Sequence, residues 1–185
     1  MSLMSTVDED TVAAALAGDG DALSVVYSVL APKVLGYLRA HGADDPEGLT
    51  TEVFLHVLRR REAIVGGAAG LRTFVFSVAH ARFVDDVRRR ARRPVETSYE
   101  PELDERHEPS AEHAAVHGAG GAHLQQLLGQ LNADQRSVIS LRVLGDLSVE
   151  QTAQVLGKST GAVKQLQRRG LLALRSVVDA GEVAW

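Results

Sequence analysis

The residues best suited to bind a partner lie near the end of the chain, in LSVEQTAQVLGKSTGAVKQLQRRG, Leu147 to Gly170. Between Lys158 and Arg175 there are five basic residues and no acidic one: Lys158, Lys164, Arg168, Arg169 and Arg175. Cations bind phosphate oxygens, and Lys, Arg and Gln side chains donate hydrogen bonds to base edges in the major groove. The stretch therefore favours contact with DNA.

Two short helices are needed to position these side chains. Ser148 followed by Gln151 is a capping-box pattern that starts one helix, and Gly157 ends it. Ser159 or Thr160 can cap the next helix, which has one apolar side made by Val163, Leu166, Gly170 and Leu174. This is a helix-turn-helix pattern. A helical hairpin with a solvated charged face is the plain alternative, but such faces mix signs, so the missing acids favour DNA.

A second basic segment lies in the first half of the chain. Leu71 to Arg93 contains Arg72, Arg82, Arg88, Arg89, Arg90, Arg92 and Arg93 against Asp85 and Asp86. An acidic stretch, Glu96 to Glu112, separates the two basic segments. The net charge of −4 would by itself disfavour nucleic acid, but binding depends on the local field rather than on the sum.

Other chemistries find little support in the sequence. Paired carboxylates and a nucleophile beside a base do not stand out, and the GGAAG motif lacks the Lys-Ser/Thr of a phosphate-binding loop. Cysteine is absent, so thiolate metal sites are excluded. Four histidines, His107, His113, His117 and His123, are interpreted as scattered exposed residues rather than ligands. We expect no metal, no cofactor and no catalytic residue. We also expect no membrane insertion and a cytoplasmic location.

The pattern of apolar residues predicts an all-α fold of two small helical domains, because sustained alternation is missing. We place the first domain at residues 1–93, a flexible acidic linker at 94–121, and the helix-turn-helix domain at 122–185. Expected helices cover residues 8–18, 21–42, 46–61, 71–93, 123–131 and 133–146, followed by the helix-turn-helix pair. The glycine-rich stretch IVGGAAGLR, residues 64–72, is expected to be a loop.

The sequence from Leu131 to Arg175 resembles the fourth conserved region of bacterial sigma factors of the extracytoplasmic-function (ECF) type. The matching residues are Leu131, Gln135, Arg136, Leu141, Arg142, Leu147, Ser148, Gly161, Val163 and Lys164. GLTTEVFLHVLRR and LRTFVFSVAHARFVDDVRRRARR resemble the second conserved region of the same family. The likeness covers about residues 19 to 178 in the family's order.

The resemblance implies a protein without catalytic chemistry that binds core RNA polymerase and directs initiation at promoters. The clamp of the largest polymerase subunit would bind Glu52, Leu55, His56 and Arg59. The flap of the second largest subunit is a further expected contact. The −10 element would be bound and opened by the glycine-rich stretch together with Arg72, His80, Arg82, Arg88, Arg89 and Arg90. The −35 element would be bound by Ser159, Thr160, Lys164, Gln165, Arg168 and Arg169. An anti-sigma factor is an expected partner, and the protein would associate with the nucleoid when active.

Several alternatives stay open at this stage. A stand-alone regulator that binds DNA as a dimer would need the same helix-turn-helix, and a small helical enzyme is a more remote possibility. Phe74, Phe76 and Phe83 suit a hydrophobic core better than base stacking. The arginines from Arg88 to Arg93 could complement a helix dipole, although they exceed what that role requires.

Overall fold

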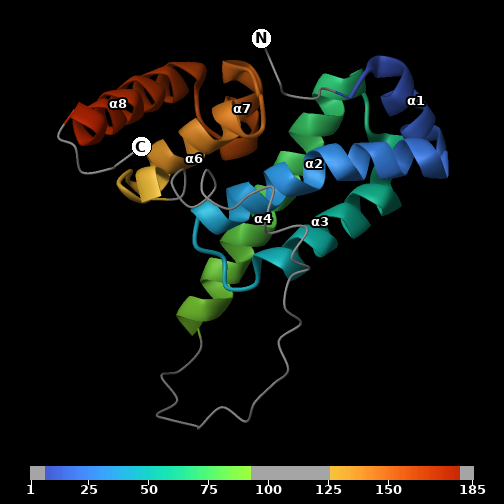
Figure 1. Ribbon diagram of the computed structural model, residues 1–185, viewed down its shortest axis with the longest axis horizontal. Coiled ribbons are helices and arrows are strands. Elements are labelled where there is room, and N and C mark those ends of the chain that lie inside the picture. The colour runs from blue at the N-terminus through green and yellow to red at the C-terminus, as the bar shows by residue number, and fades with distance from the viewer. Residues whose placement is uncertain (1–6, 93–125, 180–185) are drawn as a thin grey trace, which may run out of the picture.

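The computed structural model describes residues 7–92 and 126–179, and every regular element in these two ranges is helical (Figure 1). The all-α prediction is therefore confirmed. The predicted linker, 94–121, and the four histidines at 107, 113, 117 and 123 lie outside the described residues. Their proposed roles stay predictions.

The amino-terminal unit consists of α1 (Glu9–Ala17), α2 (Gly20–Ala40), α3 (Pro46–Arg60), a 3-10 turn (Arg61–Ala63) and α4 (Gly67–Arg92). The first three helices begin in the same way. The carboxylates of Asp8, Asp19 and Asp45 each accept a hydrogen bond from a backbone N–H in the first turn. These caps satisfy N–H groups that have no partner within the helix, which fixes where each helix starts.

The carboxy-terminal unit begins with helical residues 126–129 and continues with α6 (Ala133–Val143), α7 (Val149–Leu156) and α8 (Thr160–Asp179). The predicted capping box at Ser148 and Gln151 is present, and Gly157 adopts the left-handed conformation that ends α7. The Ser159 hydroxyl accepts the Ala162 N–H at 3.1 Å and so caps α8. The helix-turn-helix prediction is confirmed.

Helix α2 is the central element of the amino-terminal core. Its Val34, Tyr37 and Leu38 are fully buried, as are Val53 of α3 and Phe76 of α4. Burying side chains of this size contributes roughly 1.5–3 kcal/mol each. By length and composition α2 could also cross a membrane. Its packing against α1, α3 and α4 accounts for the same apolar character.

The two units pack against each other, an arrangement that the sequence left open. Helix α7 lies on α4, and α6 lies on α2 (Figure 1). Leu141 and Leu147 are fully buried in the same cluster as Phe76. Polar contacts also cross the boundary: the Gln151 amide donates to the Ala69 carbonyl at 3.1 Å, and His41 Nε2 lies 3.2 Å from the Ser137 hydroxyl. We call this packed arrangement the closed form.

The glycine-rich stretch differs from the expected loop, because helix α4 already begins at Gly67. Gly66 and Gly67 have φ angles of +90° and +58°, which side-chain-bearing residues rarely adopt. The Gly70 N–H donates to the Gly66 carbonyl at 2.9 Å. A Cβ on Gly70 would overlap the Val65 carbonyl oxygen. The loop is thus reduced to Ile64–Gly66, followed by a helical turn that only glycine allows.

Candidate nucleic-acid and polymerase interfaces

Helix α8 presents its predicted DNA-binding side chains to solvent. All six are exposed: Ser159, Thr160, Lys164, Gln165, Arg168 and Arg169. The opposite side is fixed by the fully buried Val163, which packs with Val138 and Ala153. Gly170 is also buried, and a Cβ there would lie 3.0 Å from Ile139 Cγ1. Because Gly170 has no side chain, α8 can lie this close to α6.

The charges along α8 divide into paired and unpaired groups. At its ends, Lys158 lies 3.1 Å from Asp134, and Arg175 lies 3.5 Å from Asp179. Within the described part of the chain, no ion pair involves Lys164, Arg168 or Arg169. A hollow of about 380 Å³ beside this face is lined by Ser159, Gln165 and Arg169 among others. The middle of α8 therefore carries cations that remain available for phosphates.

The six candidate residues of α4 do not form one patch. Arg72 and Arg90 are 18 positions apart, which is about 27 Å along a helix. Arg88 lies 3.8 Å from Asp85, and Arg82 lies 3.8 Å from Glu52. The latter pair joins a residue expected to bind DNA to one expected to bind polymerase. The structure thus spreads these arginines along the helix and pairs most of them with carboxylates.

Asp86 holds two of the arginines and was missed by the sequence analysis. Its side chain is 1% exposed and lies 2.7 Å from Arg89 Nη2 and 3.2 Å from Arg90 Nη2. Burial alone would raise the pKa of Asp86, but the hydrogen bonds from Arg89 and the Asp44 N–H and the charges of Arg90 and Arg89 outweigh it and hold that pKa below its ordinary value. The Asp86–Arg89–Arg90 spacing, i, i+3 and i, i+4, was the available signal.

His80 differs from the arginines with which it was grouped. Its Nδ1 lies 2.8 Å from the hydroxyl of the buried Tyr37. Burial, with a smaller effect of the Lys158 charge, lowers the pKa of His80 below its ordinary value. The ring is therefore neutral at pH 7 and would contribute a hydrogen bond rather than a positive charge. The contact of His80 with DNA stays a prediction, and its lowered pKa favours a hydrogen-bonding role over a cationic one.

The predicted polymerase-binding residues lie on α3. Glu52, Leu55 and Arg59 are exposed, and the half-buried His56 ring stacks on Phe74 with 6.1 Å between centroids. Two exposed apolar side chains beside this set were not predicted as part of it: Leu58, 37% exposed, and Tyr27 of α2, 49% exposed. Tyr27 packs edge-on against Phe54 of α3. The sequence offered only the Leu55/Leu58 spacing as a signal, because Tyr27 comes from another helix.

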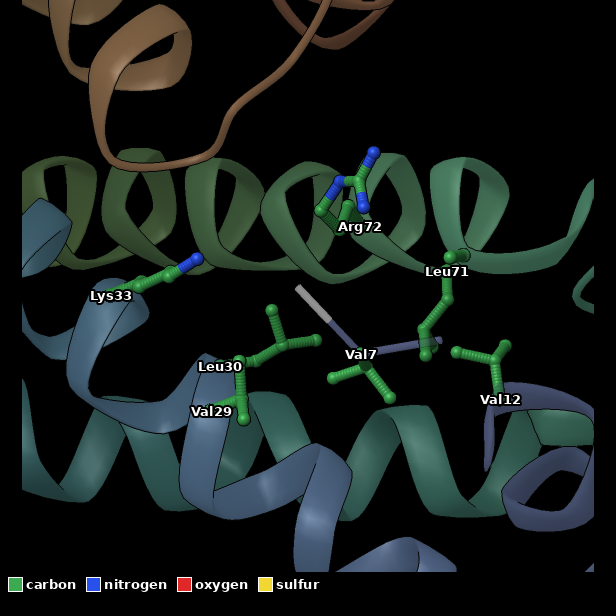
Figure 2. Close-up of a pocket in the computed structure, with 8 residues that line it drawn as sticks. Val7, Val12, Val29, Leu30, Lys33, Leu71 and Arg72 are labelled. Atoms are coloured by element: carbon green, nitrogen blue, oxygen red, sulfur yellow. The ribbon is translucent and has the colours of Figure 1, made fainter. Parts of the chain in front are cut away.

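Two further hollows lie in the described part of the protein, away from the exposed face of α8. One, of about 480 Å³, lies between the glycine-rich turn and α7 and is lined by Val65, Gly66, Phe74, Gln151 and Gln154 among others. Its size lies within the usual range for small-molecule pockets, roughly 300–1,000 Å³. The other, of about 10 Å³, has room for about one water molecule. Figure 2 shows the side chains of Leu30, Val7, Leu71 and Val12 along it, with the guanidinium group of Arg72 pointing away from them.

The fold and these surfaces define a helical DNA-binding protein with a helix-turn-helix unit and a second basic helix. The comparisons are more specific. The Sigma-70, region 4 family matches residues 127–176. The ECF RNA polymerase sigma factor SigD of Mycobacterium tuberculosis (strain H37Rv) is 34% identical over 186 residues, which cover 94% of this chain and 85% of SigD. BldN of Streptomyces coelicolor, also an ECF RNA polymerase sigma factor, is 32% identical over 168 residues; these cover 89% of this chain but only 63% of BldN.

The protein belongs to the family of ECF RNA polymerase sigma factors. Among solved structures, CnrH in complex with the cytosolic domain of CnrY has the same fold, with a TM-score of 0.63 and 19% identity over 94% of this chain and 98% of CnrH. Family membership makes the chain a factor that directs transcription from promoters, and it does not favour the stand-alone dimeric regulator.

Proposed function

We propose that the chain binds core RNA polymerase through its amino-terminal unit and uses each of its two units on a separate promoter element. The observation that carries this proposal is the cationic face of α8, which makes no ion pair with any other described residue and belongs to the helix-turn-helix. Lys164, Arg168 and Arg169 would bind phosphates and base edges of the −35 element. Ser159, Thr160 and Gln165 would add uncharged hydrogen bonds at the same face.

The clamp of the largest polymerase subunit would bind the outer face of α3, where Leu55 is 47% exposed and Arg59 is also exposed. Tyrosine and arginine are enriched in protein interfaces, and exposed apolar side chains rimmed by polar residues often mark a contact site. Leu58 and Tyr27 extend the predicted set of Glu52, Leu55, His56 and Arg59. The carboxy-terminal unit would contact the flap of the second largest subunit. We also expect an anti-sigma factor as a partner, and this expectation derives from the family.

The −10 element would be opened at the glycine-rich turn. Opening requires that a base leave the stack, which costs a few kcal/mol and needs a pocket that receives it. In the closed form, a hollow of about 480 Å³ beside Gly66 and Phe74 is closed on its other side by Gln151 and Gln154 of α7. Once α7 has moved away, the wall that contains Gly66 and Phe74 would receive such a base. Arg72, Arg82 and Arg88 would bind the freed strand, and Arg89 and Arg90 would do so while held by Asp86.

The closed form is too small to bind both promoter elements at the same time. The names −10 and −35 place the elements about 25 base pairs apart, or about 85 Å at ~3.4 Å per base pair. A compact chain of 185 residues has a radius of gyration of about 16 Å and a diameter of about 40 Å. Residues 93–125 can span at most roughly 110 Å when fully extended. We therefore infer that the units separate on the promoter.

Run-off transcription would test the proposed function. Core RNA polymerase, this chain and fragments of the encoding organism's genome are expected to give discrete transcripts that core polymerase alone does not give. A regulator that acts alone would instead protect DNA from nuclease without polymerase and would not change the start sites of core enzyme. Association with the nucleoid when active would follow from the same binding.

A further inference from the structure

The start of helix α4 is capped by a residue from a different helix. Oε2 of Glu9, in the first turn of α1, accepts a hydrogen bond from the Ala68 N–H at 2.9 Å, although the two residues are 59 positions apart. The same carboxylate lies so close to Gly67 that a Cβ on this glycine would overlap it. The Glu9 side chain therefore closes over the glycine-rich turn.

This arrangement is needed because the turn has no side chains of its own to form a cap. In α1, α2 and α3 the N-cap is an aspartate directly before the helix. At α4 the preceding residue is Gly66, which leaves the first N–H groups without a local acceptor. A carboxylate near these groups is further stabilised by the helix dipole. Glu9 supplies the acceptor that the local sequence lacks.

The position of Glu9 is itself well defined. Asp8 caps α1 by accepting the Thr11 N–H and hydroxyl, both at 2.8 Å. Val12 and Ala15, on the buried side of α1, are each 1% exposed and lie in the core cluster that includes Ala68 and Leu71 of α4. The glycines at 66, 67 and 70 have the largest backbone freedom of any residue type. A carboxylate that lies against Gly67 and accepts the Ala68 N–H restricts that freedom.

We propose that Glu9 is a positioning residue for promoter opening: it holds the turn of Gly66–Gly70 in the shape that receives the unstacked base. The inference rests on the proposed function, because it deepens the role given there to the glycine-rich turn. Glu9 acts through the Ala68 N–H and does not itself touch the base. Loss of its hydrogen bond would loosen the turn and slow strand opening, without affecting the polymerase-binding face of α3.

The experiment compares holoenzymes that contain Glu9→Ala, Glu9→Gln or the wild-type chain on a promoter identified by run-off transcription. Two templates are used, a full duplex and the same promoter with mismatched, already open bases at the −10 element. Asp10→Ala is the matched control, because Asp10 is an exposed acid in the same first turn and loses the same charge. Thermal unfolding and core polymerase binding are measured for each variant.

On duplex DNA, Glu9→Ala is expected to reduce transcripts on the order of tenfold, as for the loss of one charge-assisted hydrogen bond. Glu9→Gln keeps an acceptor oxygen and should lie between Ala and wild type. On the pre-opened template the difference should fall below about twofold, since a positioning role ends once the strands are apart.

An equal loss on both templates, or a loss matched by Asp10→Ala, would overturn the positioning role. Increased transcription by Glu9→Gln would also overturn it, because it would show that the charge of Glu9 merely repels DNA. If the wild-type chain initiates on neither template, the proposed function itself has failed, and this outcome is distinct from the others.

Discussion

Cross-linking the two units in the closed form should abolish initiation at promoters that require both elements. The chain has no cysteine, so a designed pair would be unique. Gly36 of α2 faces the carboxy-terminal unit, and a Cβ there would lie 3.8 Å from Leu144 Cδ1. Neither residue belongs to the proposed DNA or polymerase surfaces. Gly36→Cys combined with Leu144→Cys can be joined by a short, thiol-cleavable bismaleimide.

The expected size of the effect follows from the dimensions of the closed form. A body of about 40 Å cannot span elements about 85 Å apart, and DNA of this length resists the bending that would bring them together. Residual transcription should therefore equal the fraction of chain left uncross-linked. Residual transcription above this fraction would mean that the closed form still initiates.

The assay is run-off transcription with core polymerase, before and after cleavage of the cross-link by dithiothreitol. Cleavage leaves both cysteines modified, so recovery of transcripts assigns the loss to the tether and not to the modification. Each single-cysteine variant, treated with the same reagent, controls for damage at one site. Equal transcription by the cross-linked and the cleaved protein would refute the claim that the units must separate.

Three further predictions concern individual charges. In salt titrations, the affinity of the holoenzyme for promoter DNA should fall as the salt concentration rises. Arg168→Ala should reduce the slope of log affinity against log salt concentration by about 0.9, the value for one phosphate contact. Arg175→Ala, which removes a cation paired with Asp179, should leave this slope nearly unchanged. Asp86→Ala should lower the free energy of unfolding in urea by about 1–3 kcal/mol at pH 7. Because the pKa of Asp86 is held below 3.8, the difference from wild type should be full at neutral pH, begin to shrink near pH 3.8 and disappear as the pH falls through the lower pKa of the folded protein. Burial lowers the pKa of His41 to about 4 from 6.5, so the wild type should lose about 3 kcal/mol of stability between pH 6.5 and 4 relative to His41→Gln in paired urea titrations; parallel curves for the two proteins would contradict this.

The helix-turn-helix could be predicted because its determinants are local. Ser148, Gln151 and Gly157 set the ends of α7 within ten residues of sequence, and the apolar positions of α8 fix which face is buried. The exposed set from Ser159 to Arg169 followed directly from that periodicity. The pattern of apolar residues placed α1, α2 and α3 to within two residues of their observed ends, and each of these helices has its cap from an adjacent aspartate.

Contacts between distant segments could not be predicted in this way. The start of α4 was placed four residues late, because its cap comes from Glu9 rather than from a neighbouring residue. Leu141 and Leu147 are apolar, as a core requires, but nothing in the sequence says that this core also contains Phe76 of the other unit. The count of arginines on α4 likewise concealed the buried Asp86, which neutralises part of their charge.

The closed form also implies an order of events. The cationic face of α8 is exposed, and Lys164, Arg168 and Arg169 make no ion pair among the described residues, so duplex DNA can bind there without any rearrangement. The glycine-rich turn is instead covered on one side by α7, whose Gln151 amide donates to the Ala69 carbonyl. A base that enters this hollow must displace the Gln151 amide, whereas the Ala69 carbonyl keeps the hydrogen bond that it accepts from the Thr73 hydroxyl at 2.8 Å. We therefore expect binding of duplex DNA at α8 to precede release of α7, and this release to expose the glycine-rich turn to the unstacked base.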